Sequence, residues 1–230
     1  MKYALTLTAV LALCSCEAPG YRVAQERVIR PGEIASFDVL YARNCSACHG
    51  ADGQGALTVG IGRSVYLAIT DDSTIRDVIE KGRPGTPMSA FAQNAGGMLT
   101  DGQIEILVRG IRQRWGKALD SYSPPPYASQ QPGDTARGQE VFRESCAGCH
   151  GADRRGGRSI ADPSYLSLVT DQHLRTVIIV GMPNLGMPDW RGHSKPLSDA
   201  EITDVVAWLA GLRNVASSQQ GQSFSAQVKN

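Results

Sequence analysis

Two segments of the chain place two cysteines and a histidine at one spacing. Cys45, Cys48 and His49 form the first C-x-x-C-H motif, and Cys146, Cys149 and His150 form the second. Two residues between the cysteines put both sulfurs near one edge of a helical turn, with the histidine beside the second sulfur. Such a cluster could hold zinc, carry out thiol–disulfide exchange, or attach a haem through two thioethers while the histidine binds the iron.

The placement of the motifs separates these three chemistries. A structural zinc site takes four ligands, usually from two cysteine pairs that lie close together. Here Cys45 and Cys146 are 101 residues apart, at the same place in two repeats, so each site is short of ligands. A thioredoxin-like site would need a βαβ context, which the sequence lacks. We therefore predict two covalently bound haem c groups, one held by Cys45, Cys48 and His49 and the other by Cys146, Cys149 and His150.

An internal duplication relates the two motifs. Three blocks recur in the same order, and only the loops between them differ in length. The paired blocks are 40–53 with 141–154, 75–91 with 174–190, and 99–111 with 197–212. The chain should therefore contain two small, similar domains.

The stretches between and beyond the repeats set the expected boundaries. The domains are predicted at 30–116 and 134–214. The linker over 117–133 contains three consecutive prolines at 124–126 and should be extended and semi-rigid. The tail over 215–230 is polar and is predicted to be disordered.

Both halves have helical patterns, and neither has the alternation of a regular strand. Thr100 with Gln103, and Ser198 with Glu201, form capping boxes at the start of the last helix of each half. Apolar residues follow each box at helical spacing. The predicted fold class is therefore all-α. Each half has few apolar side chains for a domain of its size, and a flat apolar cofactor would complete its core.

The repeat alignment also selects a second ligand for each iron. Met88 and Met187 are 99 residues apart and occupy matched positions, 39 residues after His49 and 37 after His150. Met182 falls on Arg83, and Met98 has no counterpart, which leaves these two methionines as competitors. Methionine sulfur at the sixth position raises the reduction potential and closes the iron to substrates. We predict Met88 and Met187 as the iron ligands.

Other chemically capable residues are interpreted as structural. Phe91 and Trp190 occupy matched positions after the methionines and should pack against the haem or the ligand loop. His173 and His193 have no counterpart in the first half and are expected to be ordinary surface histidines. The arginine-rich stretch 154–158 is interpreted as a solvated loop.

Each half resembles a class I cytochrome c domain, of the small type found in dihaem cytochromes and in the haem subunit of cbb3-type oxidases. The stretches that carry the resemblance are NCSACHGADGQG and GTPMSAF in the first half, and SCAGCHGADRRG, GMPDW and LSDAEITDVVAWL in the second. It covers most of residues 33–213. It implies the three-helix cytochrome c fold, with histidine below the ring and methionine above, and one-electron transfer without proton chemistry at the iron. Ser89 follows Met88, where Pro188 follows Met187, and this departure should loosen the first ligand loop.

The N-terminal sequence is typical of an export signal. Lys2 precedes an apolar run over 3–13, which is too short to span a bilayer. The run ends in Leu-Cys-Ser-Cys, which resembles a bacterial lipobox with Cys16 as the lipidated residue and residues 1–15 removed. Cys14 is a weaker alternative, and a plain signal peptide cut a little downstream is a third interpretation. The formal net charge of +1 gives no support to a nucleic-acid role.

Together these features predict a dihaem electron carrier without catalytic activity. It would lie on the periplasmic or extracytoplasmic side, held to the membrane by lipid, and serve respiratory or photosynthetic complexes. A fixed electron-port subunit of a larger oxidoreductase is the first alternative. A dihaem peroxidase, with an exchangeable ligand on one iron, is the second.

Overall fold

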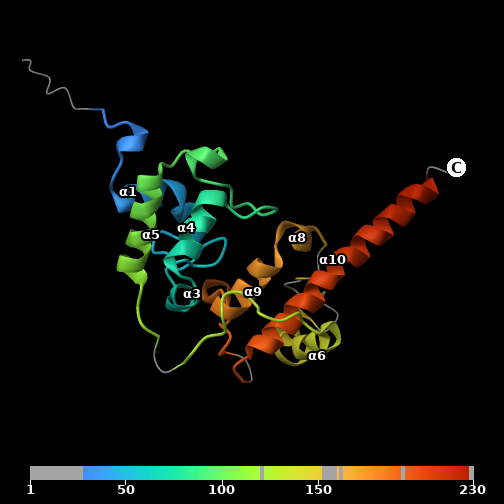
Figure 1. The fold of residues 1–230 in the computed structure, drawn as a ribbon. Coiled ribbons are helices and arrows are strands. Elements are labelled where there is room, and N and C mark those ends of the chain that lie inside the picture. Colours follow the sequence, from blue (N-terminus) through green and yellow to red (C-terminus); the bar gives the residue numbers. More distant parts are fainter. Residues whose placement is uncertain (1–27, 120–121, 152–159, 161–162, 193–194, 228–230) are drawn as a thin grey trace, which may run out of the picture. The chain divides into compact units, whose positions relative to one another are not determined.

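The described part of the chain is helical, as predicted. The computed structural model describes residues 28–119, 122–151, 160, 163–192 and 195–227. The elements are η1 (Pro31–Glu33), α1 (Phe37–Asn44), α2 (Ser46–His49), α3 (Ser64–Ile69), α4 (Asp72–Lys81), η2 (Gln93–Ala95), α5 (Asp101–Trp115), α6 (Thr135–Ser145), α7 (Ala147–His150), α8 (Pro163–Leu168), α9 (Asp171–Val180), η3 (Pro183–Leu185) and α10 (Asp199–Gln227) (Figure 1). Within these ranges extended pairing is limited to two isolated bridges, Ala92 with Leu99 and Met182 with Met187.

The first repeat is organised around α5. The Thr100 hydroxyl accepts a hydrogen bond from the Gln103 amide, and the Gln103 side chain accepts one from the Thr100 amide, so the predicted capping box is present. The inward face of α5 is at most 2% exposed and consists of Ile104, Leu107, Val108 and Ile111. This face packs against α1 and α4 (Figure 1). Burial of each such side chain contributes about 1.5–3 kcal/mol.

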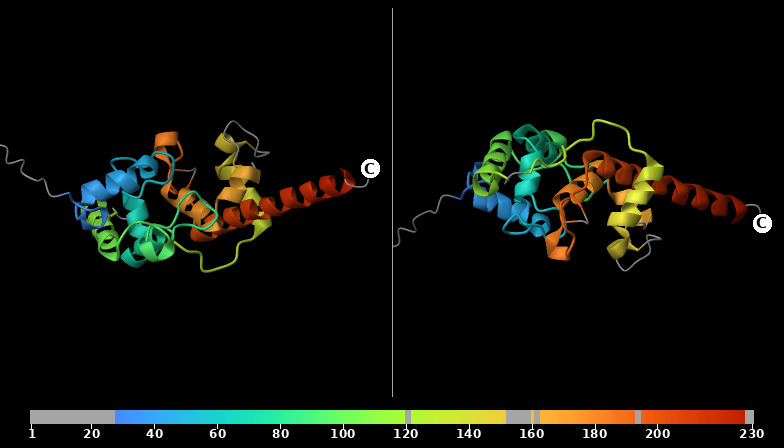
Figure 2. Two further views of the ribbon diagram at one scale, coloured as in Figure 1. Left: turned by 90° about the horizontal axis from the view of Figure 1, so that it is seen from above. Right: turned by 90° about the horizontal axis from the view of Figure 1, so that it is seen from below.

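The second repeat has the same design around α10. The Glu201 carboxylate accepts hydrogen bonds from the Ser198 amide and hydroxyl, and the Glu201 amide donates to that hydroxyl, which confirms the second box. The buried face of α10 consists of Ile202, Val205, Val206 and Leu209. The helix packs against α6, α8 and α9, and both views in Figure 2 show α6 lying across it.

One arginine from the last helix of each repeat fixes the two short helices that precede it. The guanidinium donates to two carbonyls at the end of the first of these helices and pairs with an aspartate at the start of the next. The partners are Leu67, Thr70 and Asp72 for Arg112, and Leu166, Val169 and Asp171 for Arg213. The partners are related by 99 residues, so the arrangement is common to both repeats.

The linker packs on the second repeat. Arg175 is only 3% exposed, and its guanidinium donates to the carbonyls of Pro126 at 2.8 Å and Tyr127 at 3.0 Å. The Gln172 side chain donates to the same Tyr127 carbonyl at 2.7 Å. Asp199 pairs with Arg175, which compensates the cost of burying its charge. Part of the linker is therefore held against α9.

The structure differs from the sequence predictions at the C-terminus. The tail over 215–230 is predicted to be disordered, whereas α10 continues to Gln227. Helix propagation explains this difference, because each residue added to an existing helix gains a hydrogen bond without a new nucleation cost. The signal segment 1–15, Cys16, the stretch 154–158 and His193 lie outside the described residues. In the described part of the chain, no helix combines the length and apolarity needed to cross a bilayer.

Candidate haem sites

The first C-x-x-C-H motif occupies a joint between two helices. Cys45 ends α1 and begins α2, and its carbonyl accepts hydrogen bonds from the Cys48 amide at 3.2 Å and the His49 amide at 3.0 Å. The single turn of α2 thus brings the three side chains together, and Gly50 ends it with φ of +82°. Cys45 is half-buried, Cys48 is exposed, and both are free thiols. The thiols are thus available for two thioether bonds.

The His49 ring is held in one orientation. Its Nδ1 lies 2.8 Å from the Val59 carbonyl oxygen. Because a carbonyl can only accept, Nδ1 carries the proton, and the lone pair is on Nε2. Burial lowers the pKa of His49, although the bond to Val59 opposes this effect. The ring is therefore a neutral imidazole whose Nε2 can bind a metal. The hydrogen bond at Nδ1 fixes the orientation of the ring, as is usual for metal-binding histidines.

The second motif has the same local structure. Cys146 ends α6 and begins α7, and its carbonyl accepts hydrogen bonds from the amides of Cys149 at 3.1 Å and His150 at 2.9 Å. Gly151 ends the turn with φ of +76°. The His150 ring packs near Phe142, with centroids 6.5 Å apart. The loop that follows contains residues 152–159, which lie outside the described residues.

The two methionine loops also have matching backbones. In the first repeat the Arg83 amide donates to the Met88 carbonyl at 2.8 Å, and in the second the Met182 amide donates to the Met187 carbonyl at 2.9 Å. Both bonds relate positions 99 residues apart, so the structure supports the register in which Met88 pairs with Met187. The Thr86 hydroxyl also accepts from the Met88 amide at 3.2 Å.

Glycines allow each methionine loop to approach the helix before it. Gly82 and Gly181 follow α4 and α9 with φ of +67° and +70°. A Cβ at Gly82 would lie 2.6 Å from the Met88 carbonyl oxygen, and one at Gly181 would lie 2.6 Å from the Pro188 carbonyl oxygen. Only glycine permits this backbone contact, because any other residue would place a Cβ in the same space. The contact keeps each methionine loop close to the end of the preceding helix.

Comparison with known proteins agrees with these duplicated sites. Residues 32–109 and 133–209 match the family described as cytochrome C oxidase, cbb3-type, subunit III. The chain belongs to this family. Each repeat is a cytochrome c-type domain, and the chain binds two haem c groups. The resemblance noted from the motifs is confirmed, as is the prediction of two haems.

Relatives come from two kinds of respiratory complex. The chain is 30% identical over 193 residues to the cbb3-type cytochrome c oxidase subunit CcoP of Azospirillum sp. (strain B510), covering 75% of this chain and 60% of the relative. It is 25% identical over 232 residues to the cytochrome bc1 complex cytochrome c subunit of Corynebacterium diphtheriae. That match covers 94% of this chain and 80% of the relative. The chain therefore spans about 60% of the CcoP relative.

A solved structure was also matched. It is the reducing HAO-like protein complex Kustc0457/Kustc0458 of Kuenenia stuttgartiensis, at 18% identity and a TM-score of 0.46. The match covers 76% of this chain and 94% of that one.

Two buried donors fit a haem independently of the motifs. Nε1 of Trp190 and Nε of Arg63 are buried and have no hydrogen-bond partner among the described residues. Buried donors nearly always have an acceptor. A haem propionate is an anionic acceptor of the kind that these two donors lack. Trp190 follows the second methionine loop and is 7% exposed, which agrees with its expected packing role.

The first cysteine of each motif is poorly suited to thiol–disulfide exchange. Burial, with a smaller effect from Cys48, raises the pKa of Cys45 to about 12. Burial and then Cys149 raise the pKa of Cys146 to about 11. Reactive thiols of oxidoreductases have lowered pKa values, because the thiolate is the nucleophile. The raised pKa values of Cys45 and Cys146 are the opposite of what a nucleophilic thiol needs.

The competing methionines are placed differently from one another. Met98 is 79% exposed, so it lies away from the core. Met182 is half-buried, like Met187, and faces it across the isolated bridge. Since bridge partners lie side by side, Met182 is the competitor that a substitution must test. Met88 and Met187 remain the predicted ligands.

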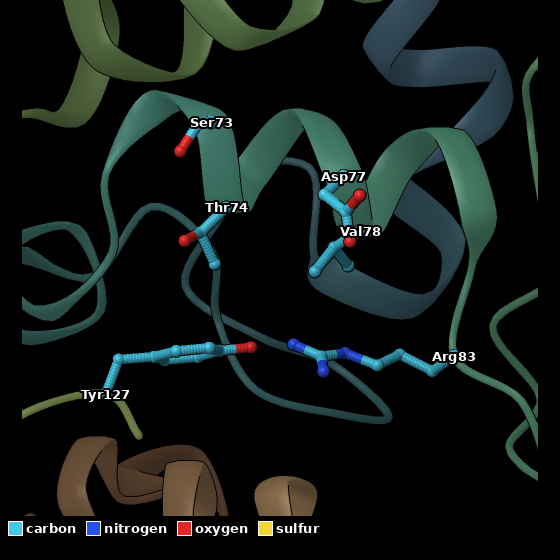
Figure 3. A pocket seen from close by; sticks show the side chains of 6 residues that line it. All are labelled: Ser73, Thr74, Asp77, Val78, Arg83 and Tyr127. Atoms are coloured by element: carbon cyan, nitrogen blue, oxygen red, sulfur yellow. The ribbon is translucent and has the colours of Figure 1, made fainter. Parts of the chain in front are cut away.

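A cavity of about 410 Å³ has none of the predicted ligands in its lining. Its lining residues are Ser73, Thr74, Asp77, Val78, Arg83 and Tyr127. Figure 3 shows Arg83 and Tyr127 extended toward each other below α4, and the Arg83 guanidinium carbon lies 5.7 Å from the Tyr127 ring centroid. Burial, and then the Arg83 charge, lower the pKa of His173. His173 is half-buried, in contrast to the expected surface position, because α9 packs against α3 of the other repeat.

Proposed function

We propose that this cytochrome carries single electrons between redox protein partners on the extracytoplasmic side of a membrane. One observation carries the proposal: each repeat combines a thiol pair, an adjacent histidine and a matched methionine loop. When bound, each haem supplies reversible one-electron exchange at its iron. The protein residues determine how that iron is held and which molecules reach it.

In the first domain, Cys45 and Cys48 would form the two thioethers. The Val59 carbonyl orients His49 so that its Nε2 can bind the iron. Met88, from a loop held by Arg83, would be the second ligand of that iron and would exclude peroxide and oxygen. An iron bound by two protein ligands in this way favours electron transfer over catalysis.

In the second domain, the corresponding roles fall to Cys146 and Cys149 as thioether residues, His150 as the first ligand and Met187 as the second. The Met182–Met187 bridge holds the ligand loop by two hydrogen bonds, of 2.9 and 3.1 Å. Pro188 stiffens that loop further, whereas Ser89 follows Met88. We infer that the second iron is the more firmly ligated of the two.

Spectra of methionine variants test this assignment. The oxidised protein should show two low-spin haems, each with a sulfur-to-iron charge-transfer band. Met88→Ala and Met187→Ala should each abolish one band, while Met98→Ala, the matched control, should leave both. Loss of the second band in Met182→Ala instead of Met187→Ala would contradict the assignment. Binding of cyanide at high affinity or turnover of peroxide by the unmodified protein would favour a peroxidase.

A fixed electron port is the second candidate, favoured by the names of the relatives. CcoP and the bc1 cytochrome c subunit are both named as subunits of complexes. Extraction in mild detergent separates the candidates. A carrier should migrate mainly at its own size, whereas a port should migrate with a large oxidoreductase. Constant co-migration would refute the carrier.

Membrane attachment is proposed to depend on lipid at Cys16. Several acyl chains anchor a protein firmly, whereas one anchors it marginally. Cys16→Ala should therefore release the protein from the membrane fraction, and Cys14→Ala, two residues earlier, should not. Release by Cys14→Ala alone would move the modification to that residue, and release by neither would exclude a lipid anchor here.

A further inference from the structure

One side chain joins the two haem domains. The residues described after position 30 belong to one compact unit. Within it Asn184, from η3 in the second methionine loop, reaches the loop that follows the first C-x-x-C-H motif. Its Nδ2 donates to the Gly55 carbonyl at 2.8 Å and approaches the Gln54 carbonyl at 3.5 Å. The contact thus joins two loops that belong to different haem sites.

The contact continues into the first site through one further hydrogen bond. The Gly55 amide donates to the His49 carbonyl at 2.8 Å. A short connection therefore runs from the backbone of His49, through the Gly55 peptide, to the side chain of Asn184. His49 is the predicted iron ligand of the first domain.

Asn184 is tied equally closely to the second site. It lies in the turn between Met182 and Met187, and the Leu185 and Met187 amides both donate to the Met182 carbonyl, at 2.8 and 3.1 Å. Asn184 therefore lies in the same turn as Met187, and that turn is held by backbone hydrogen bonds. The connection links the histidine side of one haem site to the methionine side of the other.

The first methionine loop has no equivalent of Asn184. The matched position, 99 residues earlier, is Gly85, which has φ of +75° and no atom within 4 Å of a Cβ placed there. A donor at this position is thus specific to the second repeat. The junction joins the domains in one order, with the first domain's haem loop against the second domain's methionine loop.

One other contact supports the same junction. Helix α3 of the first repeat packs against α9 of the second. The two repeats therefore meet through these helices as well as through Asn184.

We propose that Asn184 is the positioning residue for electron exchange between the two haems, holding the His49–Gly55 loop against the Met187 loop. This inference rests on the proposed electron-transfer function. One electron leaves the reduced iron of one site as the oxidised iron of the other gains it, so no proton or further reactant is needed. Asn184 touches neither iron and acts through the two loops.

Two substitutions separate the hydrogen bond from the shape of the side chain. Asn184→Ala removes the side chain, while Asn184→Asp keeps its shape and replaces the donor by an acceptor that opposes the Gly55 carbonyl. Asn184→Gln retains an amide donor and should rescue. Asn94→Ala is the matched control, because Asn94 is an exposed asparagine in η2.

The main measurement is the rate of electron exchange between the haems after rapid reduction of one of them by a flash. Small displacements of the reacting groups reduce reaction rates steeply. We therefore expect electron exchange between the haems to slow by roughly tenfold or more in the Ala and Asp variants. The Gln and Asn94 variants should stay within roughly twofold of the unmodified protein. The spectrum of each haem should be unchanged in all four.

A second measurement does not depend on electron transfer. Amide hydrogen exchange over residues 50–57 should accelerate in the Ala and Asp variants, because the Gly55–His49 bond opens more often once Asn184 no longer holds the loop. The Asp variant answers the question if the Ala variant fails to fold.

The outcomes are distinguishable from those that test the carrier. Unchanged exchange in both the Ala and Asp variants would overturn the inference even if both haems are low-spin. Equal slowing in Asn94→Ala would also overturn it, because the effect would not depend on the junction. If peroxide turnover disproves the carrier, slowed exchange in Asn184→Asp would still support the role of Asn184.

Discussion

Substitution of Gly82 by alanine should detach Met88 from the first iron. Gly82 has φ of +67° and ψ of −159°, a region that is essentially restricted to glycine. Forcing alanine into it costs about 1–3 kcal/mol. The new Cβ would also lie 2.6 Å from the Met88 carbonyl oxygen, where ordinary contacts begin at 3.4 Å. The methionine loop must therefore retreat by the difference, 0.8 Å, unless α4 moves instead.

That displacement is large for a metal–sulfur bond, whose length is fixed by coordination chemistry. Gly82→Ala should therefore lose the sulfur-to-iron band of the first haem, lower its reduction potential and allow exogenous cyanide to bind. The second haem, with its own loop at Gly181, should keep its band. Optical spectra of the oxidised protein, a redox titration and a thermal denaturation curve measure these effects.

Gly85→Ala is the matched control, because Gly85 also has positive φ but has no atom within 4 Å of its added Cβ. It should lose stability through backbone strain and yet retain the band. The reasoning is refuted if Gly82→Ala keeps the band of the first haem. It is equally refuted if Gly85→Ala loses that band, because strain alone would then be sufficient.

Two further predictions concern stability in the second domain. Arg213→Ala should lower the free energy of unfolding by about 1–3 kcal/mol, because the carbonyls that it contacts lose their donor. Urea unfolding measures this loss, and the exposed control Arg143→Ala should show no comparable change. Arg112→Ala should repeat the effect in the first domain. The Lys195 ammonium, opposed by burial and assisted by Ser198, lowers the pKa of Glu201 from 4.5 to about 2. A lowered carboxyl pKa stabilises the ionised folded state, so this contribution should be complete above about pH 4.5 and disappear as the pH falls to about 2. Glu201→Gln should flatten the pH dependence of the unfolding midpoint in that window, and an unchanged slope would contradict the assignment.

The local features were predictable because they depend on short stretches of chain. Helical spacing identified the buried faces of α5 and α10, and the Thr100 and Ser198 boxes marked their starts. The duplication gave the 99-residue register of Met88 and Met187, which the loop hydrogen bonds support. Each of these signals is confined to about two helical turns or to a direct comparison of the repeats.

Contacts between backbone groups that are distant in the chain leave no comparable pattern in the sequence. The partner of His49 is the carbonyl of Val59, which any residue type could supply, so the sequence does not mark it. The contact of Asn184 with Gly55 joins different domains, and its counterpart Gly85 breaks the repeat that guided every other assignment. The helical continuation to Gln227 depends on propagation from a folded segment, which the polar composition of the tail does not reveal.

The arginines that fix the short helices have a consequence for the history and engineering of the two domains. Aligned by their capping boxes, 98 residues apart, Arg112 falls on Ala210 and Arg213 falls on Trp115. The same partners are thus reached from positions three residues, or about 4.5 Å, apart along the helix. The two copies therefore place this arginine at different positions on the last helix, and its partners are equivalent in both. A chimera that exchanges their last helices would move each guanidinium by three residues along the helix, away from its carbonyls. These domains are therefore not interchangeable modules.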